Sequence, residues 1–134
     1  MNDCLFCKII KGEIPSYKIF EDEHAYAFLD LHPIERGHVL MVPKFHAEQL
    51  FRLPPEELSS VMPAVQRVAT LLKARLHCDG LALCQFNGEA AGQTVGHVHF
   101  HLIPRYSGHS AGWEPMEPPP THETLMALQQ EILG

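Results

Sequence analysis

Three histidines at alternate positions are the feature of this sequence that most clearly indicates chemistry. From Gly96 to Ile103 the chain reads GHVHFHLI, so each histidine is followed by an apolar residue. Successive side chains of a β-strand point to opposite faces, so a strand over residues 97–103 would have one histidine face and one apolar face. A polar face that only met solvent would mix Thr, Lys, Glu and Ser. The repeated residues are His97, His99 and His101.

One metal ion cannot comfortably take all three of these histidines as ligands. A strand rises by about 3.3 Å per residue, so His97 and His101 would lie ~13 Å apart, whereas a zinc–nitrogen bond is only about 2 Å long. Adjacent members of the triad can still share an ion. We therefore expect the three histidines to have different roles, with a catalytic metal on the triad as the less favoured alternative.

A pair of cysteines near the N-terminus offers ligands for such an ion. Cys4 and Cys7 form a C-x-x-C pair, which has three interpretations: half of a metal site, a redox couple, or chance. A redox couple normally follows a strand, whereas this pair precedes the first predicted one. Zinc prefers four tetrahedral nitrogen or sulfur ligands, and His46 and His97 would complete a Cys₂His₂ structural site. The alternative is an empty site with reduced thiols.

His99 then remains as the central reactive group. A neutral imidazole is a good nucleophile near neutral pH, because its unperturbed pKa is about 6.5. Attack by imidazole on phosphorus gives a phosphoramidate that water can hydrolyse, which divides one displacement into two steps. His101 lies two residues further on and can contact a phosphate oxygen or the departing group.

A glycine-rich loop precedes the triad and is a candidate phosphate cradle. It runs over residues 87–96, which is long for a hairpin connection, and long loops are often functional. Glycines such as Gly92 let backbone N–H groups turn towards an anion, and Gln93 and Thr94 add neutral donors. The alternative is a flexible hairpin with no ligand.

The rest of the chain predicts the elements that must position these residues. Apolar residues at helical spacing predict one long helix from Pro54–Pro55 to Leu76, kinked at Pro63. Alternation and turn residues predict strands at 17–21, 25–30, 37–42, 81–86 and 97–103, and short helices at 5–11 and 121–133. This indicates an α+β fold with a five-stranded, mainly antiparallel sheet. We expect one domain over residues 1–134, with a C-terminal tail at 109–134.

The composition limits the classes of protein to which the chain can belong. It has 134 residues, 16 acidic against 10 basic, a formal net charge of −6 and 46% hydrophobic residues, which suits one globular domain. Without a basic excess we expect no nucleic-acid polymer as a partner. No apolar stretch approaches the ~18 residues of a membrane span and no signal peptide is visible, so we expect no membrane partner and a cytoplasmic location. The four cysteines are then not expected to form a disulfide framework.

The motifs together resemble the histidine triad nucleotide-binding superfamily. The segment His97–Ile103 is similar to the signature of that family. Further similar segments are Leu5–Ile10, Phe28–Asp30, Gly37–His46 and Asn87–Gly96. The resemblance covers roughly residues 3–108 and implies the fold described above.

The resemblance also implies roles for individual residues. Relatives hydrolyse or transfer nucleoside monophosphates through a nucleotidyl-histidine on the middle triad residue, here His99. Asp30 matches a carboxylate that accepts the ribose hydroxyls. The positions that surround the α-phosphate match Asn87, Gln93, Thr94 and His101. Zinc-containing, bacterial-type members have ligands that match Cys4, Cys7, His46 and His97. Members commonly pair as homodimers through the long helix and the adjacent strand.

We therefore expect a hydrolase or transferase that acts on a purine nucleotide or dinucleotide. It would cleave at the α-phosphate of dinucleoside polyphosphates or nucleoside phosphoramidates. The alternative is a nucleotide-binding sensor or scaffold with little turnover. The chain departs from the phosphoramidase branch of the family in two places. The loop between Asn87 and Gln93 is one residue shorter, and the tail beyond Arg105, which includes Trp113, is different.

Overall fold

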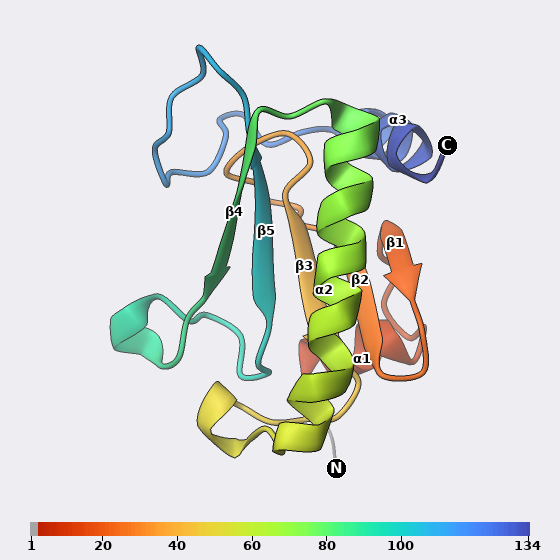
Figure 1. The fold of residues 1–134 in the computed structure, drawn as a ribbon, viewed down its shortest axis with the longest axis vertical. Coiled ribbons are helices and arrows are strands. Elements are labelled where there is room, and N and C mark those ends of the chain that lie inside the picture. The colour runs from red at the N-terminus through yellow and green to blue at the C-terminus, as the bar shows by residue number, and fades with distance from the viewer. Residues whose placement is uncertain (1–2) are drawn as a thin grey trace.

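The computed structural model describes residues 3–134, which form a five-stranded antiparallel sheet with helices on both faces (Figure 1). The strands lie in the order β1-β2-β3-β5-β4. The α+β class predicted from the sequence is confirmed. The elements are α1 Leu5–Ile10, β1 Lys18–Glu21, β2 Ala25–Leu29, β3 Val39–Pro43, the short 3₁₀ helix η1 Leu50–Arg52, α2 Pro55–Leu76, β4 Gly80–Gln85, a second 3₁₀ helix η2 Glu89–Ala91, β5 Phe100–Arg105 and α3 His122–Leu133.

The long helix α2 covers one face of the sheet and makes the main hydrophobic core. Its buried side chains recur at helical spacing and pack against β2, β3 and β5. The helix is unbroken at Pro63, an exposed position, and a proline at its N-terminal end suits the first turn. The terminal helix α3 packs beside the C-terminal half of this layer, against α2 and β1 (Figure 1).

A second, smaller core lies on the opposite face, where α1 packs behind β2 and β3. Phe6 and Ile9 of α1 contact apolar side chains of those two strands. Every residue of β2 and β3 is consequently buried, which explains why their sequences are apolar without alternation. This second core matters for function because α1 brings Cys4 and Cys7 to the sheet.

The strand that carries the triad begins later than predicted. β5 starts at Phe100 and continues to Arg105, whereas the alternation predicted a strand over 97–103. Pairing with β4 stops at Phe100 because Gln85 is the last residue of β4, and pairing with β3 stops at Met41 although β3 continues to Pro43. Just before the strand, the Val98 N–H donates to the Ala47 carbonyl at 2.7 Å. His97 and His99 therefore precede the regular ladder.

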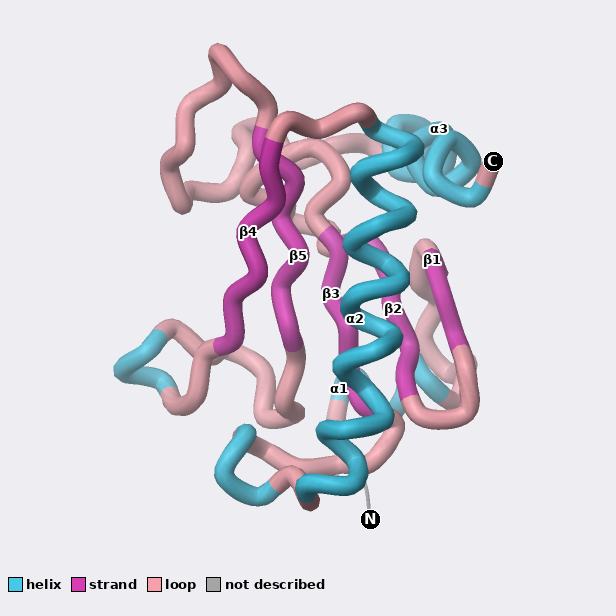
Figure 2. The backbone as a smooth tube through the Cα atoms, viewed as in Figure 1, coloured by secondary structure: helices cyan, strands magenta, loops and turns pink. Residues whose placement is uncertain are grey.

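The alternation of the two faces holds even so. Phe100 and Leu102 join the core under α2, whereas the rings of His97 and His99 contact Phe6 of α1 on the other face. The two longest connections lie at opposite ends of the sheet: residues 86–99 between β4 and β5, and residues 106–121 between β5 and α3 (Figure 2). Of the helices described, none is long and apolar enough to cross a membrane.

Candidate functional site

Four side chains from distant parts of the sequence meet beside α1. The Sγ atom of Cys4 lies 3.3 Å from Nδ1 of His97. The Sγ atom of Cys7 lies 3.4 Å from Nδ1 of His46 and 3.6 Å from Nδ1 of His97. The two imidazole Nδ1 atoms are 3.1 Å apart, and all four donor atoms lie within 4.8 Å of one another. The structure thus brings together all four residues predicted as metal ligands.

The spacing and protonation of this cluster fit a zinc ion. With zinc–sulfur and zinc–nitrogen bonds of about 2.3 and 2.0 Å, tetrahedral ligands lie about 3.3–3.8 Å apart, close to the spacing observed here. The Nε2–H of His97 donates to the Pro43 carbonyl at 2.8 Å, so its Nδ1 presents a lone pair to the cluster. Burial also lowers the pKa of His97 to about 4, which keeps the ring neutral at neutral pH.

The ring of His99 is oriented by the backbone of the preceding histidine. Its Nδ1 lies 2.7 Å from the His97 carbonyl oxygen. A carbonyl can only accept, so the proton must be on Nδ1, and Nε2 carries the lone pair. Burial lowers the pKa of His99, although the hydrogen bond to the His97 carbonyl opposes that shift. A neutral imidazole with an unprotonated Nε2 is the form that can act as a nucleophile.

His101 is oriented through a second buried histidine. The Ile34 N–H donates to Nδ1 of His38 at 3.0 Å, so in the neutral ring the proton is on Nε2. That Nε2–H lies 3.0 Å from Nδ1 of His101. Nδ1 of His101 is then the acceptor, and its own proton must be on Nε2. Burial, and next the neighbouring His99, lowers the pKa of His101 to about 4, so this ring is also neutral at neutral pH.

His38 is the functional residue that the sequence pattern identified least clearly. In the sheet, Leu40 of β3 pairs with His101 of β5. His38 lies two residues before Leu40 and shares its face, so it is a diagonal neighbour of His101. Burial lowers the pKa of His38, in opposition to the charge of Asp30. The strand register would have been needed to find this contact from sequence.

Asp30 follows β2 and lies beside the same pair of histidines. Its Oδ2 is 3.5 Å from Nε2 of His38, and its Oδ1 accepts the His32 N–H at 2.9 Å. The backbone N–H of Asp30 donates to the His38 carbonyl at 3.0 Å, which fixes the carboxylate relative to β3. Asp30 therefore presents a hydrogen-bond acceptor to the space in front of the histidines.

That space is a cavity of about 590 Å³ on the α1 side of the sheet. Its lining combines the predicted reactive residues with apolar and aromatic side chains from β4 and from the segment after β5. The residues are Asp30, His32, Ile34, His38, Cys84, Phe86, Gly92, Thr94, His99, His101, Trp113 and Pro115. Five residues predicted to meet a substrate thus lie around one cavity.

Two further predicted residues, Asn87 and Gln93, are outside this lining. Asn87 accepts the Leu50 N–H at 2.8 Å, and Gln93 accepts the Gly88 N–H at 2.7 Å and donates to the Glu48 carbonyl at 2.7 Å. Both side chains therefore hold the loop between β4 and β5 in shape. Their predicted contact with phosphate stays a prediction.

The three triad histidines do not converge on one point. Among the described residues, His97 belongs to the cluster with the two cysteines and His46, whereas His101 lies with Asp30 and His38. His99 belongs to neither group and lines the cavity between them. This geometry agrees with a division of roles within the triad.

Comparison with known proteins decides which family this arrangement represents. The model of the HIT domain matches residues 11–108. The chain belongs to the HIT family. The HIT protein is 44% identical to the adenosine 5'-monophosphoramidase HNT1 of Saccharomyces cerevisiae over 134 residues, which cover 98% of this chain and 81% of the yeast protein. It is also 50% identical to an uncharacterized HIT-like protein of Methanocaldococcus jannaschii. That match covers 78% of this chain and 81% of the archaeal protein.

Solved structures of HIT proteins have the same fold. A Hit-like protein from Bartonella henselae superposes with a TM-score of 0.89 at 36% identity, covering 99% of this chain and 96% of the other. A zinc-bound histidine triad family protein from Mycobacterium smegmatis superposes with a TM-score of 0.83 at 35% identity, covering 97% and 93%. Relatives named as phosphoramidases show that this HIT protein is a hydrolase.

Proposed function

We propose that this HIT protein cleaves nucleoside phosphoramidates at the α-phosphate through a nucleotidyl intermediate on His99. The observation that carries the proposal is the opposite orientation of two neighbouring neutral rings. His99 directs an unprotonated Nε2, and His101 an Nε2–H, towards the same cavity. A nucleophile and a hydrogen-bond donor are thus held side by side, with ring centroids 5.0 Å apart. The name of the yeast relative supports the same substrate class.

The reaction would proceed in two displacements. Nε2 of His99 attacks the α-phosphorus of the nitrogen-protonated substrate, a P–N bond forms, and the bond to the amine breaks with its electron pair on the amine. His101 donates a hydrogen bond to the reacting group, while the His97 carbonyl accepts the Nδ1–H of the cationic His99 adduct. Water then attacks phosphorus, the bond to His99 breaks, and a proton is released with the nucleoside monophosphate.

The other residues of the cavity would bind the nucleotide. Asp30 accepts hydrogen bonds, as required to hold ribose hydroxyls. Gly92 and Thr94 line the cavity at the loop before the triad and would meet the phosphate. Asn87 and Gln93 would act through the shape of that loop, since their side chains bond within it.

The charge of the cavity favours phosphoramidates over dinucleoside polyphosphates. Of the described residues that line it, none is Lys or Arg, and its histidines near the reaction centre are neutral. A leaving nucleotide of a polyphosphate would place several negative charges against a described lining that offers no Lys or Arg side chain. A leaving amine carries no such charge.

Replacement of His99 tests the proposed function. Wild-type protein incubated with an adenosine 5'-phosphoramidate should yield a tryptic peptide carrying one adenylyl group on His99, seen by mass spectrometry. His99→Ala should lose the adduct and at least ~10³-fold of kcat, because no other group of the cavity can replace the nucleophile. His24→Ala, which removes a half-buried histidine outside the cavity, is the matched control.

Turnover that persists in His99→Ala would contradict the proposal. Tight binding of the nucleotide by wild-type protein without adduct or turnover would instead identify a nucleotide sensor.

We further propose that Cys4, Cys7, His46 and His97 bind one structural zinc ion. The zinc-bound relative from Mycobacterium smegmatis supports this proposal, as does the spacing of the four donor atoms. When bound, zinc would cross-link α1 to the loop after β3 and to the segment that carries His99. It would contribute folding free energy rather than a reaction step.

Cys4→Ser tests the metal site with little disturbance of α1. Cys4 caps this helix by accepting the Cys7 N–H, and serine is among the best capping residues, so the cap is preserved. We expect zinc content, measured by atomic emission, to fall from about one per chain to well below half, and Tm to fall with it. Cys84→Ser, outside the cluster, should retain its zinc. Unchanged zinc in Cys4→Ser would remove Cys4 from the ligand set.

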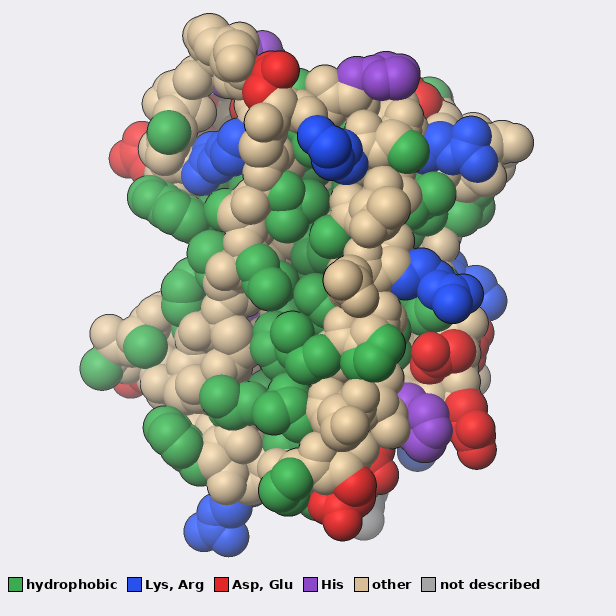
Figure 3. Space-filling view, in the orientation of Figure 1, with side chains coloured by type: hydrophobic (Ala, Val, Ile, Leu, Met, Phe, Trp, Pro, Cys, Tyr) green, Lys and Arg blue, Asp and Glu red, His purple; other side chains and the backbone are tan. Residues whose placement is uncertain are grey.

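We also propose that the protein is a homodimer paired through α2 and β4. β4 is an edge strand, and apolar side chains gather between α2 and β4 (Figure 3). Met62 of α2 and Leu83 of β4 are exposed large hydrophobic residues of these two elements. A contiguous apolar patch beside an open sheet edge is typical of an interface.

The cytoplasmic location expected from the sequence stays a prediction.

Two leucines of equal exposure test the dimer. Leu83 on β4 and Leu133 at the end of α3 are both 47% exposed. Sedimentation velocity should show a dimer for wild-type protein and for Leu133→Lys, and a monomer for Leu83→Lys, because the buried charge would have no partner in the interface. A wild-type monomer, or a dimer unaffected by Leu83→Lys, would contradict this pairing.

A further inference from the structure

A second cavity lies on the other side of the sheet from the cavity in front of the triad, which is called the triad cavity here. It measures about 330 Å³ and is called the α3 cavity. Leu29 of β2, a residue of the main core, lines it from below, and α3 forms one wall. The helix lies beyond the segment matched by the HIT domain, which ends at residue 108. The α3 wall is therefore additional to the segment that carries the triad.

Most of the lining of the α3 cavity is apolar. The apolar lining residues include Leu29, Pro33, Pro120, Leu125, Ala127 and Leu128. Protein interiors are packed nearly as densely as organic crystals, so apolar space of this size beside a closed core is unusual. A cavity of about 150 Å³ is enough for benzene. The α3 cavity, at about 330 Å³, therefore has room for a bicyclic ring.

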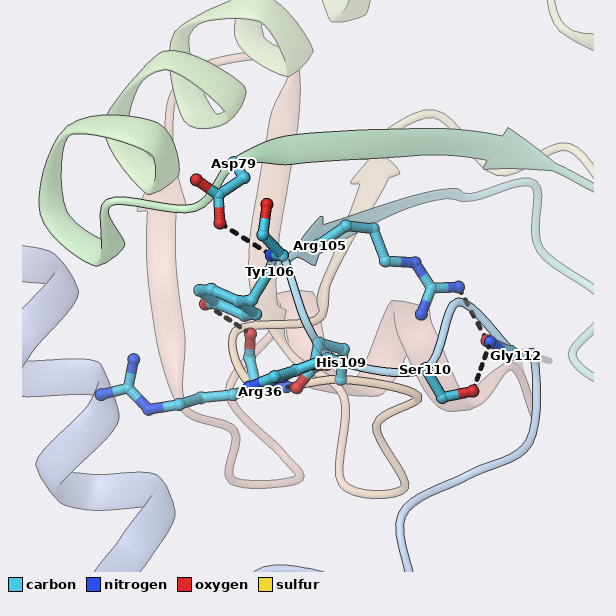
Figure 4. Close-up of polar contacts among 9 residues, drawn as sticks. Arg36, Asp79, Arg105, Tyr106, His109, Ser110 and Gly112 are labelled. Atoms are coloured by element: carbon cyan, nitrogen blue, oxygen red, sulfur yellow. Dashed lines mark hydrogen bonds and ion pairs between the residues drawn. The ribbon is translucent and has the colours of Figure 1, made fainter.

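One ion pair joins the two walls at the opening of the α3 cavity. The guanidinium of Arg36, on the loop before β3, contacts the carboxylate of Glu131 on α3, and both side chains are 45% exposed. The Arg36 side chain extends from the loop on the side of α3 (Figure 4). Asp30 is the remaining charged residue of the described lining. Because Glu131 neutralises Arg36, this lining offers no unpaired cation to an anionic ligand.

The loop over residues 30–38 separates the α3 cavity from the triad cavity. Asp30 and His38 line both spaces. Between them, residues 32 and 34 line only the triad cavity, and residues 33, 36 and 37 line only the α3 cavity. Nε2 of His38 lies 3.0 Å from Nδ1 of His101. A shift of this loop would therefore be transmitted to the triad.

Two hydrogen bonds fix the side of the loop that faces the α3 cavity. The Met116 N–H donates to the Pro33 carbonyl at 2.8 Å. The Tyr106 hydroxyl donates to the Arg36 carbonyl at 3.0 Å (Figure 4). The cavity is thus preformed, which lowers the cost of ordering its walls around a ligand.

We propose that the α3 cavity binds a small neutral molecule that is largely apolar and about the size of a bicyclic ring. The apolar lining, the paired Arg36 and the preformed walls all favour such a ligand. Its contact with the loop over residues 30–38 would change the environment of His38. The site is independent of the hydrolysis proposed above, so the failure of either proposal leaves the other standing.

Indole serves as the probe, because it is neutral and bicyclic and has one N–H for the Thr124 hydroxyl in the lining. Titration of ¹³C,¹⁵N-labelled wild-type protein should shift the methyl signals of Leu29, Leu125 and Leu128, with a Kd of about 1 mM or tighter. Indole-2-carboxylate, the matched anion, should bind at least about tenfold more weakly, because the lining has more acidic than basic residues. Unshifted methyl signals, or equal binding of the anion, would overturn the proposal.

Glu131→Gln tests the origin of the preference for a neutral ligand. The substitution leaves Arg36 without its partner at the opening, so indole-2-carboxylate should bind more tightly and the two Kd values should come within about threefold. Glu123→Gln removes an exposed acidic residue of the same helix outside the cavity and should keep the wild-type ratio. A wild-type ratio in Glu131→Gln would contradict the proposed selection by charge.

Ala127→Phe tests the position of the ligand. Ala127 lines the cavity at the surface of α3, so a phenyl ring there should occupy the space and raise the Kd of indole at least about fivefold. Met126→Phe places the same ring at an exposed position of the same helix outside the cavity, and the Kd should not change. Unchanged binding in Ala127→Phe would place indole elsewhere and overturn the inference. If this variant displaces α3, as a lowered Tm would show, Glu131→Gln still decides.

The ring nitrogens of His38 report on the shared loop without any turnover. In long-range ¹H–¹⁵N spectra, indole should shift the His38 signals of wild-type protein and of Met126→Phe, but not those of Ala127→Phe. Unchanged His38 signals at saturating indole would overturn the predicted link between the two cavities.

Discussion

The structure depends on a hydrogen bond to one nitrogen of each triad imidazole. A neutral imidazole has one donor and one acceptor nitrogen, so a fixed partner on one side decides what the other side can do. Nε2 of His97 donates to Pro43, Nδ1 of His99 donates to the carbonyl of His97, and Nδ1 of His101 accepts from His38. Because burial keeps the rings neutral, these partners leave a lone pair on His97, a lone pair on Nε2 of His99 and an N–H on His101. These groups suit the proposed metal ligand, nucleophile and hydrogen-bond donor.

His97 connects the two halves of the site. Its imidazole faces the cysteines and His46, while its own carbonyl holds the ring of His99. Any displacement of His97 would therefore move His99, the proposed nucleophile. The second core between α1 and the sheet, in which Phe6 contacts the rings of His97 and His99, limits such movement. This explains how a cluster with no step in the reaction can still matter for the geometry of the reaction.

Much of this arrangement could be predicted from the sequence, because it follows from the types of the residues and from their periodicity. The sheet, the long helix and the distribution of His97, His99 and His101 on one face follow from alternation and helical spacing. The start of β5 was predicted too early. Its ladder begins at Phe100, opposite the last residue of β4, and alternation does not record where strand pairing ends. The contact of His38 with His101 depends on strand register. The place of Trp113 depends on how an irregular segment is tethered, and no local pattern specifies that. The extent of one domain over residues 1–134 stays a prediction.

The most direct test of the account is the protonation of individual ring nitrogens. In ¹⁵N-labelled wild-type protein at about pH 7, long-range ¹H–¹⁵N spectra distinguish the two neutral tautomers of each histidine. The account predicts that His99 carries its proton on Nδ1 and that His101 carries its proton on Nε2. A spectrum in which His101 is protonated on Nδ1, or in which His99 is protonated on Nε2, would contradict the assignment of nucleophile and donor.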